Sequence, residues 1–510
     1  MVLTESLPLI PLPNSAVPGE GALRLTDATR VHGEPSSARM LVDAMTRRTG
    51  MRLEIAPDAS GPASGDIVLR VDPAAGAAEG YRLVIADDAE IVGADSAGLA
   101  HGVHTLLQLL REDDDGWALR HAVVSDAPRF AYRGVMLDVA RRFFPVDEVR
   151  TVIDRAAALK FNHLHLHLSD DQGWRIHIDS WPLLSQRSST ASATGDGSLA
   201  GGGCYSRADY SEIVAYAASR HITVVPEIDM PGHTHAIGVA YPELVEAPVM
   251  NEHLLDDAAR LGHALPEAGV PYTGWGVGHS SLRIREERTY DFVRDVLTEL
   301  AELTPGPYLH IGGDESLGTS AEDFAYFVGR ATEIVSSLGK TPVAWHEAGA
   351  APGLASGTVG QFWGALTPEA AHAAQAARFV ERGGRLILSP SDAAYLDMKY
   401  DEHFPIGQDW AGVIDVQRAY DWEPVTLLDV PASAIAGVEA PLWTETVRSL
   451  ADAEQLMHPR LAAVAEVAWS APGPQRSWAS FRERLGAQAP AWRADGIRFH
   501  PTPEIPWSDR

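Results

Sequence analysis

From residue 131 onward the chain repeats one pattern, in which a short apolar run is followed by a longer stretch with helical spacing. Eight such runs occur, and their length and apolar content predict buried strands. An alternating series of eight strands and helices predicts an α/β fold, the (β/α)8 TIM barrel. The predicted strands are 134–140, 163–169, 223–229, 308–314, 341–347, 358–363, 385–390 and 437–443.

The stretches between these runs predict amphipathic helices. In 146–160, Val149, Val152 and Ile153 fall on one helical face, and 288–303 repeats this spacing. A doubly wound open sheet shows the same alternation, so the number of strands decides in favour of the barrel. No Gly-x-Gly-x-x-Gly fingerprint follows the first strand, which weakens a nucleotide-binding alternative.

The N-terminal part of the chain differs from the repeating part. Alternating runs at 67–71 and 81–87 predict strands, and 98–111 predicts an amphipathic helix. We therefore divide the chain into an α+β supporting domain at 1–128 and the barrel domain at 129–510. This smaller domain carries no cluster of acids or histidines that would indicate chemistry.

Charge and cysteine content exclude several classes of partner. The formal net charge of −28 repels nucleic acid and anionic membranes, so we expect neither as a partner. The only cysteine, Cys204, excludes an intramolecular disulfide and a cysteine metal cluster. The first residues lack the features of a secretory signal, so we expect a cytoplasmic location, with secretion as the alternative if a leader was removed. The sequence contains no apolar run of about 18 residues, so it predicts no membrane span.

Two connections between predicted strands are unusually long. Residues 185–203 are rich in Ser, Thr and Gly, and residues 234–287 carry several Gly and His with little periodicity. Long loops in a compact domain are usually functional or disordered. Both connections follow the carboxyl ends of strands, so we expect them to lie over a site on that face of the barrel.

Polar and aromatic side chains collect where the predicted strands end. In a barrel these carboxyl ends form the catalytic face. A single Asp there is often a helix cap and a single Trp is often a core residue, but all eight strands end in this way. The candidates are Arg141, Asp170, Asp171, Asp229, His233, Asp314, Glu315, Trp345, Trp363, Tyr395, Asp397, Trp443 and Glu445.

The residue types indicate a sugar site. Aromatic rings stack on the apolar faces of a pyranose, and acids and Arg hydrogen-bond its hydroxyls. Glycosidases usually hold two carboxyl groups about 5 Å apart across the anomeric carbon when they retain configuration. Adjacent strand residues point to opposite sides, so Asp314 and Glu315 cannot easily form such a pair. We expect Glu315, with its longer reach, to be the better candidate for a general acid, and Asp314 to serve another purpose.

Several stretches make the chain resemble a known family. They are YLHIGGDES, RGVMLDVARRFFPVDEV, HLHLHLSDDQGWRIHIDSWP, VVPEIDMPGHTHA, YLDMKYD and GVEAPLWTET. With them the chain resembles glycoside hydrolase family 20, the β-N-acetylhexosaminidases, and in particular their actinobacterial members, over nearly its whole length.

The resemblance implies a retaining hydrolase that releases terminal β-linked GlcNAc or GalNAc, from substrates such as chitooligosaccharides. In this family the nucleophile is the 2-acetamido oxygen of the substrate rather than a protein carboxylate. By resemblance, Glu315 is the general acid, Asp314 holds the acetamido N–H and stabilises the oxazolinium ion, and Tyr395 binds the acetamido oxygen. No cofactor and no metal are implied. The preference between the two sugars, the natural glycan and the oligomeric state stay open.

The resemblance assigns the remaining site residues to substrate binding and to a proton relay. Asp170 and His233 form the relay behind Glu315. The residues expected to contact the sugar or the leaving group are Arg141, Trp345, Trp363, Asp397, Trp410, Trp443 and Glu445. We also expect the charge of Asp314 to raise the pKa of Glu315 by repulsion, which keeps a general acid protonated.

The run HLHLHL leaves one point open. His163, His165 and His167 share a face of a regular strand, and that face is the face of Asp171, not of Asp170. Either the strand bends, or these histidines point toward the helices and are structural, which we favour. Two other functions remain as alternatives: a metal-dependent amidohydrolase that uses a His-x-His pair with an Asp, and a carbohydrate-binding protein without catalysis.

Overall fold

The computed structural model describes residues 7–57, 61–193 and 202–509. Part of the predicted Ser/Gly-rich connection, 194–201, therefore lies outside the described residues. The contacts divide the chain into two compact units. The first comprises Met1–Ala131, Ala157–Lys160 and His458–Arg510, and the second comprises Tyr132–Ala156 and Phe161–Met457.

The second unit is built around a closed barrel of eight parallel strands, which confirms the predicted fold class. Each predicted strand has a counterpart, and several end earlier than predicted because the chain leaves the sheet in irregular turns. The strands are β9 (Tyr132–Asp138), β10 (His163–His167), β13 (Thr223–Glu227), β14 (Tyr308–His310), β15 (Thr341–Trp345), β16 (Val359–Phe362), β17 (Leu386–Leu388) and β18 (Ile435–Leu442).

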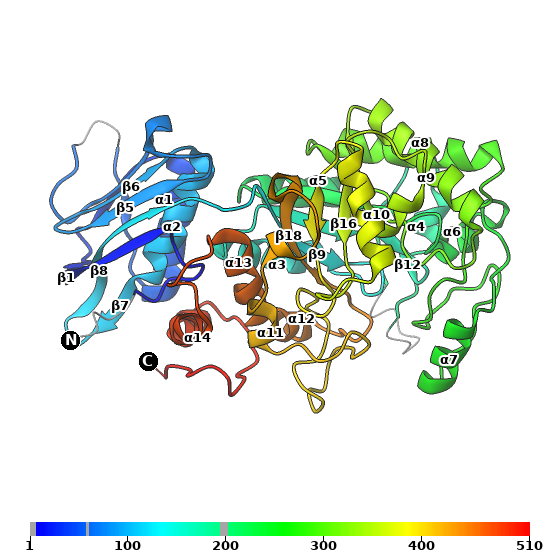
Figure 1. The fold of residues 1–510 in the computed structure, drawn as a ribbon. Coiled ribbons are helices and arrows are strands. Elements are labelled where there is room, and N and C mark those ends of the chain that lie inside the picture. Colours follow the sequence, from blue (N-terminus) through cyan, green and yellow to red (C-terminus); the bar gives the residue numbers. More distant parts are fainter. Residues whose placement is uncertain (1–6, 58–60, 194–201, 510) are drawn as a thin grey trace. The chain divides into compact units, whose positions relative to one another are not determined.

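Helices surround this barrel, as Figure 1 shows for α8, α9 and α10. Capping side chains mark the starts of some of them: in α5, Ser206 and Asp209 form a reciprocal capping box, and in α9 the Ser320 side chain accepts from Asp323 N. The helices after the barrel strands are α3 (Val146–Ala158), α5 (Arg207–Ala218), α8 (Glu287–Leu303), α9 (Ala321–Ser337), α10 (Ala370–Glu381), α11 (Val416–Tyr420) and α12 (Leu450–Met457).

The connections that follow β10 and β13 carry short elements of their own. They hold the two-stranded sheet β11 (Ser169–Asp170) and β12 (Gly173–Trp174), and the helices α4 (Leu183–Arg187), α6 (His235–Ala240) and α7 (Glu252–Leu261). None of the helices within the described ranges is long and apolar enough to cross a membrane.

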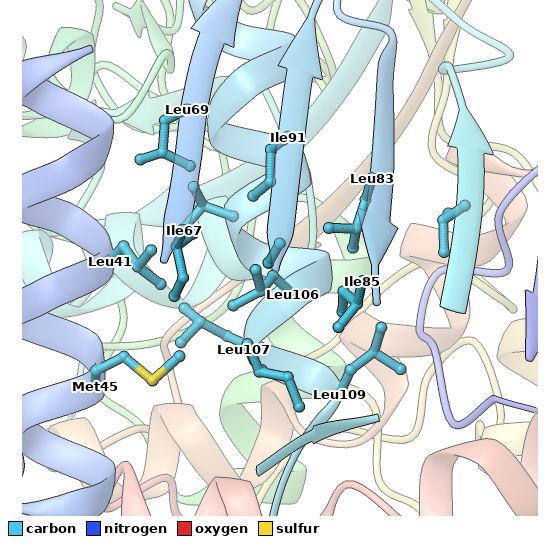
Figure 2. Close-up of a cluster of buried hydrophobic side chains, with 14 of the residues drawn as sticks. Leu41, Met45, Ile67, Leu69, Leu83, Ile85, Ile91, Leu106, Leu107 and Leu109 are labelled. Atoms are coloured by element: carbon cyan, nitrogen blue, oxygen red, sulfur yellow. The ribbon is translucent and has the colours of Figure 1, made fainter. Parts of the chain in front are cut away.

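The first unit is an α+β sandwich of helices on a mixed sheet. Its strands are β1 (Ser15–Arg24), β2 (Arg30–Gly33), β3 (Glu54–Ile55), β4 (Ile67–Val71), β5 (Tyr81–Ile85), β6 (Ala89–Gly93), β7 (Leu110–Asp113) and β8 (Gly116–Asp126). Its helices are α1 (Pro35–Thr49), α2 (Ser96–Gln108), α13 (Arg460–Trp469), α14 (Trp478–Gly486) and α15 (Ala489–Ala494). Figure 2 shows its core, in which apolar side chains of α1 and α2 meet those of the sheet: Leu41, Met45, Ile67, Leu69, Leu83, Ile85, Ile91, Leu106 and Leu107.

The C-terminal segment groups with this first unit, whereas we had assigned it to the domain 129–510. Buried polar contacts explain the grouping: the Arg484 guanidinium donates to the carbonyl of Leu9, and Arg48 forms a 2.7 Å ion pair with Asp495. Such long-range pairs leave no periodic trace in the sequence. The boundary at 128/129 itself remains a prediction.

Candidate active site

A cavity of about 290 Å³ opens among residues that follow the carboxyl ends of the barrel strands. Nine of the predicted site residues line it: Arg141, His233, Asp314, Glu315, Trp363, Tyr395, Trp410, Trp443 and Glu445. Of the predicted residues outside the lining, three contact it from behind. Asp170 forms an ion pair with Arg141, the ring of Trp345 lies 6.1 Å from that of Trp443, and Asp397 accepts a 3.4 Å hydrogen bond from the Trp443 backbone.

A sharp turn after β14 brings the two adjacent acids to the same cavity. The strand ends at His310, and Gly312 and Gly313 then adopt φ values of +70° and +100°. A Cβ atom at Gly312 would lie 1.7 Å from Asp229 Oδ1, so only glycine fits there. The predicted strand 308–314 was therefore too long, and the alternation of an extended strand does not apply to the acids. Both of them face the cavity.

Glu315 combines a strained backbone with a protonatable carboxyl group. Its φ of +44° is rare for a residue with a side chain and is typical of functional positions. Burial raises its pKa to about 7, and Asp314 adds to this increase while His233 opposes it. The raised pKa of Glu315 agrees in direction with our prediction, but the main cause of the increase is burial rather than the charge of Asp314. The side chain keeps 35% of its surface exposed, on the side of the cavity.

His233 stands behind the acid pair. Its Nε2 atom lies 3.6 Å from Glu315 Oε2 and 3.9 Å from Asp314 Oδ2. Its Nδ1 atom is hydrogen-bonded to Asp170 Oδ1 at 3.1 Å. Burial alone would lower the pKa of His233, but Asp170, Asp229 and Asp314 together raise it well above the usual value. The imidazole therefore carries its positive charge between these acids.

Asp170 is an ionised anchor for several cations. Its Oδ2 atom lies 2.8 Å from Arg141 Nη2 and 2.7 Å from His167 Nε2. Burial opposes the charge, but Arg141 and His233 hold the pKa of Asp170 well below its usual range. Arg141 in turn lies over the ring of Trp443 at 5.0 Å, so the anchor also fixes the wall of the cavity.

The histidines of β10 point into the barrel, and our preference for structural histidines facing the helices was wrong. His165 bonds to Glu227 at 3.0 Å and to Glu439 at 2.9 Å, and all three side chains are fully buried. The chain bends after His167, because Asp170 leaves the barrel to pair with β12. Inward histidines are tolerated because the two carboxylates satisfy their hydrogen bonds.

Aromatic rings form the wall beside the acids. The ring of Trp410 lies 6.1 Å from that of Trp363 and 5.9 Å from that of Tyr395, edge-on in both cases. Burial, reinforced by Asp397, raises the pKa of Tyr395 well above its usual value, so the phenol keeps its proton and can donate it to a ligand. Across the cavity, Asp314 Oδ1 is buried and no described residue donates a hydrogen bond to it.

Our sequence reasoning missed two acids that contact tryptophans of the site, the fully buried Glu227 and the half-buried Glu347. Glu347 accepts a 3.0 Å hydrogen bond from Trp363 Nε1, and Glu227 accepts a 2.9 Å hydrogen bond from Trp345 Nε1. Glu347 ends the predicted strand TPVAWHE, so the rule of strand ends could have found it, whereas Glu227 lies inside the predicted strand TVVPEID and ends only the shorter strand β13 of the structure. We overlooked them because tryptophan N–H partners cannot be read from spacing.

The long connection 234–287 contributes to the lining of the cavity, in agreement with its predicted place at the site. Its helix α7 contributes His253, Asp257 and Arg260 to the lining, followed by Trp275 and Val277. The polar side chains of α7 that line the cavity contact each other, because Asp257 lies 2.8 Å from Arg260 and 3.5 Å from His253. Our reading of this connection missed the helix.

A TIM barrel with an acid pair in a tryptophan-walled cavity at the strand ends defines a glycoside hydrolase. Comparison with known sequences narrows this class. The family model described as "Glycosyl hydrolase family 20, catalytic domain" matches residues 130–472, and that of "domain 2" matches residues 6–127. A "Beta-N-acetylhexosaminidase" from Cellulomonas fimi is 41% identical over 472 residues, which is 92% of this chain and 89% of the relative.

Solved structures agree with the sequence comparison. One described as "A Glycoside Hydrolase Family 20 beta-N-Acetylglucosaminidase" is 51% identical, with a TM-score of 0.90 over 98% of this chain and 99% of its own. The Streptomyces plicatus N-acetyl-beta-hexosaminidase in complex with Thio-NAglucal is 45% identical, with a TM-score of 0.88 over 98% of each chain. The chain belongs to glycoside hydrolase family 20, the family of the β-N-acetylhexosaminidases, which confirms the resemblance and the enzyme class predicted from the sequence.

Proposed function

We propose that this enzyme is a retaining exo-β-N-acetylhexosaminidase that releases terminal, non-reducing β-linked GlcNAc or GalNAc by substrate-assisted catalysis. One observation carries the proposal: a protonatable Glu315, with its pKa raised to about 7, adjoins Asp314, whose buried Oδ1 atom is available to accept a hydrogen bond. One group suits proton donation to a leaving oxygen, and the other suits an acetamido N–H.

In the first step Glu315 donates its proton to the glycosidic oxygen. The acetamido oxygen of the substrate attacks C1 from the opposite side, and the bond from C1 to the leaving oxygen breaks. Asp314 accepts the acetamido N–H and offsets the positive charge of the oxazolinium ion. Tyr395, which keeps its phenolic proton, donates a hydrogen bond to the acetamido oxygen and orients it.

In the second step Glu315, now a carboxylate, takes a proton from a water molecule that attacks C1. The bond from C1 to the acetamido oxygen breaks, and the electron pair returns to the acetamide. Two inversions at C1 leave the β configuration retained. His233 and Asp170 form the relay that holds a positive charge behind Glu315 and stabilises its carboxylate between the steps.

The other residues of the cavity bind the sugar. Trp363 and Trp443 line the cavity and supply apolar faces for the acetamido methyl group and the pyranose ring, and the buried Trp345 supports this acetamido pocket from behind Trp443. Trp410, which is 52% exposed, suits the leaving-group side. The groups proposed to bind the sugar hydroxyls are Arg141, Asp397 and Glu445.

The test compares initial hydrolysis rates of an aryl β-N-acetylglucosaminide and an aryl β-glucoside, for the wild type and for Glu315→Gln. We expect turnover of the N-acetyl sugar alone, because the glucoside lacks the internal nucleophile. We also expect the variant to lose about 10²–10⁴-fold in rate on the acetamido substrate. Comparable turnover of the glucoside would show that a protein group is the nucleophile.

The same experiment addresses the alternatives. A carbohydrate-binding protein would bind N-acetylglucosamine without hydrolysing either substrate. A metal-dependent amidohydrolase would lose activity on chelation, but the fifth and sixth barrel strands end at Trp345 and next to Trp363 instead of at metal ligands. We therefore expect chelation to leave the rate unchanged.

A further inference from the structure

A buried chain of polar groups runs through the barrel from Trp345, behind Trp443, to the acid pair. It starts at Trp345 Nε1, which donates to Glu227 Oε1 at 2.9 Å. The other oxygen of Glu227 accepts from His167 Nδ1, and His167 Nε2 is 2.7 Å from Asp170 Oδ2. From there the relay through His233 reaches Glu315, so one continuous path joins the two halves of the site.

Glu227 is the branch point of this path. Its side chain is fully buried on β13, and its two oxygens serve three donors: Trp345 on one oxygen, and His165 and His167 on the other. His310 Nδ1 lies 3.0 Å from the first oxygen as well. A carboxylate can accept on both sides, whereas a carboxamide offers one acceptor and one donor group. The position therefore requires an acid rather than a polar residue of the same shape.

The charges along the path alternate. Burial alone would lower the pKa of His167, but Glu227 and Asp170 raise it well above the usual value, so His167 is an imidazolium between two carboxylates. The other ionisable groups that face His167 are Arg141, whose Nη1 atom lies 3.4 Å away, and Asp229. Glu227 itself faces His165, His310 and Asp229 in addition to His167.

We propose that Glu227 is a positioning residue that holds the acetamido pocket at Trp345 and the proton relay of Glu315 in one rigid unit. This inference rests on the proposed function, because it takes Trp345 as the support of the acetamido pocket behind Trp443 and Glu315 as the general acid. Glu227 lines no part of the described cavity and touches the reaction only through these two neighbours. Its role is to keep the nucleophilic acetamido group and the general acid Glu315 in the correct positions relative to each other.

The barrel interior offers a matched control, Glu439. It is also fully buried and kept ionised by its neighbours, and it bonds to Tyr132, His165 and Gln361. Among the described contacts, none joins Glu439 to Trp345 or to His167. Glu439→Gln therefore perturbs the same polar interior without cutting the path.

The experiment measures kcat/KM of Glu227→Gln, Glu439→Gln and the wild type for aryl β-N-acetylglucosaminide across pH. In Glu227→Gln the new amide must turn its single oxygen toward either Trp345 or the two histidines. The hydrogen bonds on the other side are therefore lost, and the path is broken there. We expect kcat/KM to fall about 10–100-fold at the optimum, because small misplacements of reacting groups have effects of this size. The kcat/KM of Glu439→Gln should fall much less.

The pH profile separates positioning from simple loss of packing. In Glu227→Gln, Asp170 still holds His167 in its charged form, so the relay gains one net positive charge. This stabilises the Glu315 carboxylate and moves the alkaline limb of kcat/KM to lower pH. His167→Gln removes the positive charge instead and should move the same limb to higher pH, which gives a second variant if the first fails to fold.

The acyl group supplies a further readout. With Trp345 released, Glu227→Gln should discriminate less between N-acetyl and N-butanoyl substrates than the wild type does. Equal rate losses in Glu227→Gln and Glu439→Gln, with an unmoved alkaline limb and unchanged acyl discrimination, would overturn the inference. A wild type that hydrolyses the aryl β-glucoside equally well would instead refute the proposed function, so the two failures are distinguishable.

Discussion

At the scale of single residues, the chemistry of the site depends on environment more than on residue type. Asp314 and Glu315 are neighbouring carboxyl groups, and burial raises the pKa of Glu315 to about 7. Next to them His233 carries a positive charge that its acidic neighbours maintain. The raised pKa suits Glu315 to proton donation, while the buried Oδ1 atom of Asp314 stays available as a hydrogen-bond acceptor.

The pKa of Glu315 predicts the alkaline limb of activity. A general acid must be protonated, so kcat/KM should be constant below pH 7 and fall about tenfold per unit above it. The measurement is kcat/KM across pH with a phenyl glycoside, whose leaving group requires protonation. A dinitrophenyl glycoside, whose leaving group departs without a proton, should show a much weaker limb. Equally steep limbs for both substrates would contradict the assignment of Glu315.

At the scale of elements, the turns after the strands decide where the functional groups point. After β14, two glycines with positive φ redirect the chain, and Gly313 N donates to Asp229 Oδ1 at 2.9 Å. After β10, the chain bends into β11 and carries Asp170 to Arg141. Regular strands would have placed these acids on alternating faces, so the irregular segments build the site on a regular barrel.

We expect Gly312→Ala to damage both stability and activity. The new methyl group would overlap Asp229, including its backbone, and the residue would be strained at a φ of +70°. The combined cost is roughly 2–5 kcal/mol, and activity should fall about 100-fold as the acid pair shifts. Thermal unfolding and kcat/KM measure the two effects.

Gly339→Ala is the matched control for this prediction. Gly339 has a similar φ of +73°, but a Cβ atom there meets nothing within 4 Å. This variant should lose only about 1–2 kcal/mol from backbone strain and keep full activity. Similar losses in both variants would mean that strain, rather than the contact with Asp229, makes glycine necessary at Gly312.

At the scale of the whole molecule, the first unit is assembled from segments far apart in the sequence. Within it the Lys160 ammonium lies 2.9 Å from Asp126, and both side chains are almost completely buried. The same carboxylate accepts from Tyr81 OH at 2.9 Å and from Trp469 Nε1 at about the same distance. One acid thus joins an N-terminal strand, the segment Ala157–Lys160 and helix α13 in a single network.

We expect Asp126→Ala to destabilise the protein by about 3–5 kcal/mol, because it leaves a buried ammonium group without its carboxylate. Asp113→Ala removes a partner of Arg24 in a solvent-exposed pair, and its effect on stability should be far smaller because water screens that pair. Thermal or urea unfolding compares the two, and kcat/KM of the folded fraction should be unchanged in both. A small effect of Asp126→Ala on stability would show that water or rearranged side chains can replace the carboxylate as partner of the Lys160 ammonium group.

Much of this architecture can be predicted from local patterns. The strands and helices follow from apolar periodicity, and the acids Asp314 and Glu315 stand out because they directly follow a strand and two glycines. Glu227 and His167 were harder to interpret, because an inward or outward direction depends on which face of β10 meets the barrel interior. Trp345 was found as an aromatic strand end, but its partner Glu227 lies more than a hundred residues away in the sequence.

The amino-acid sequence by itself determined the eight-stranded barrel, the family and the residues that gather at the strand ends, because these follow from periodicity and contiguous motifs. Only the tertiary structure decided that the β10 histidines face inward, that burial sets the pKa of Glu315, and that the C-terminal segment joins the first unit. The physical reason is that burial and hydrogen-bond partners are properties of neighbours in space. Chain geometry after a strand's last residue decides which of those neighbours a side chain meets.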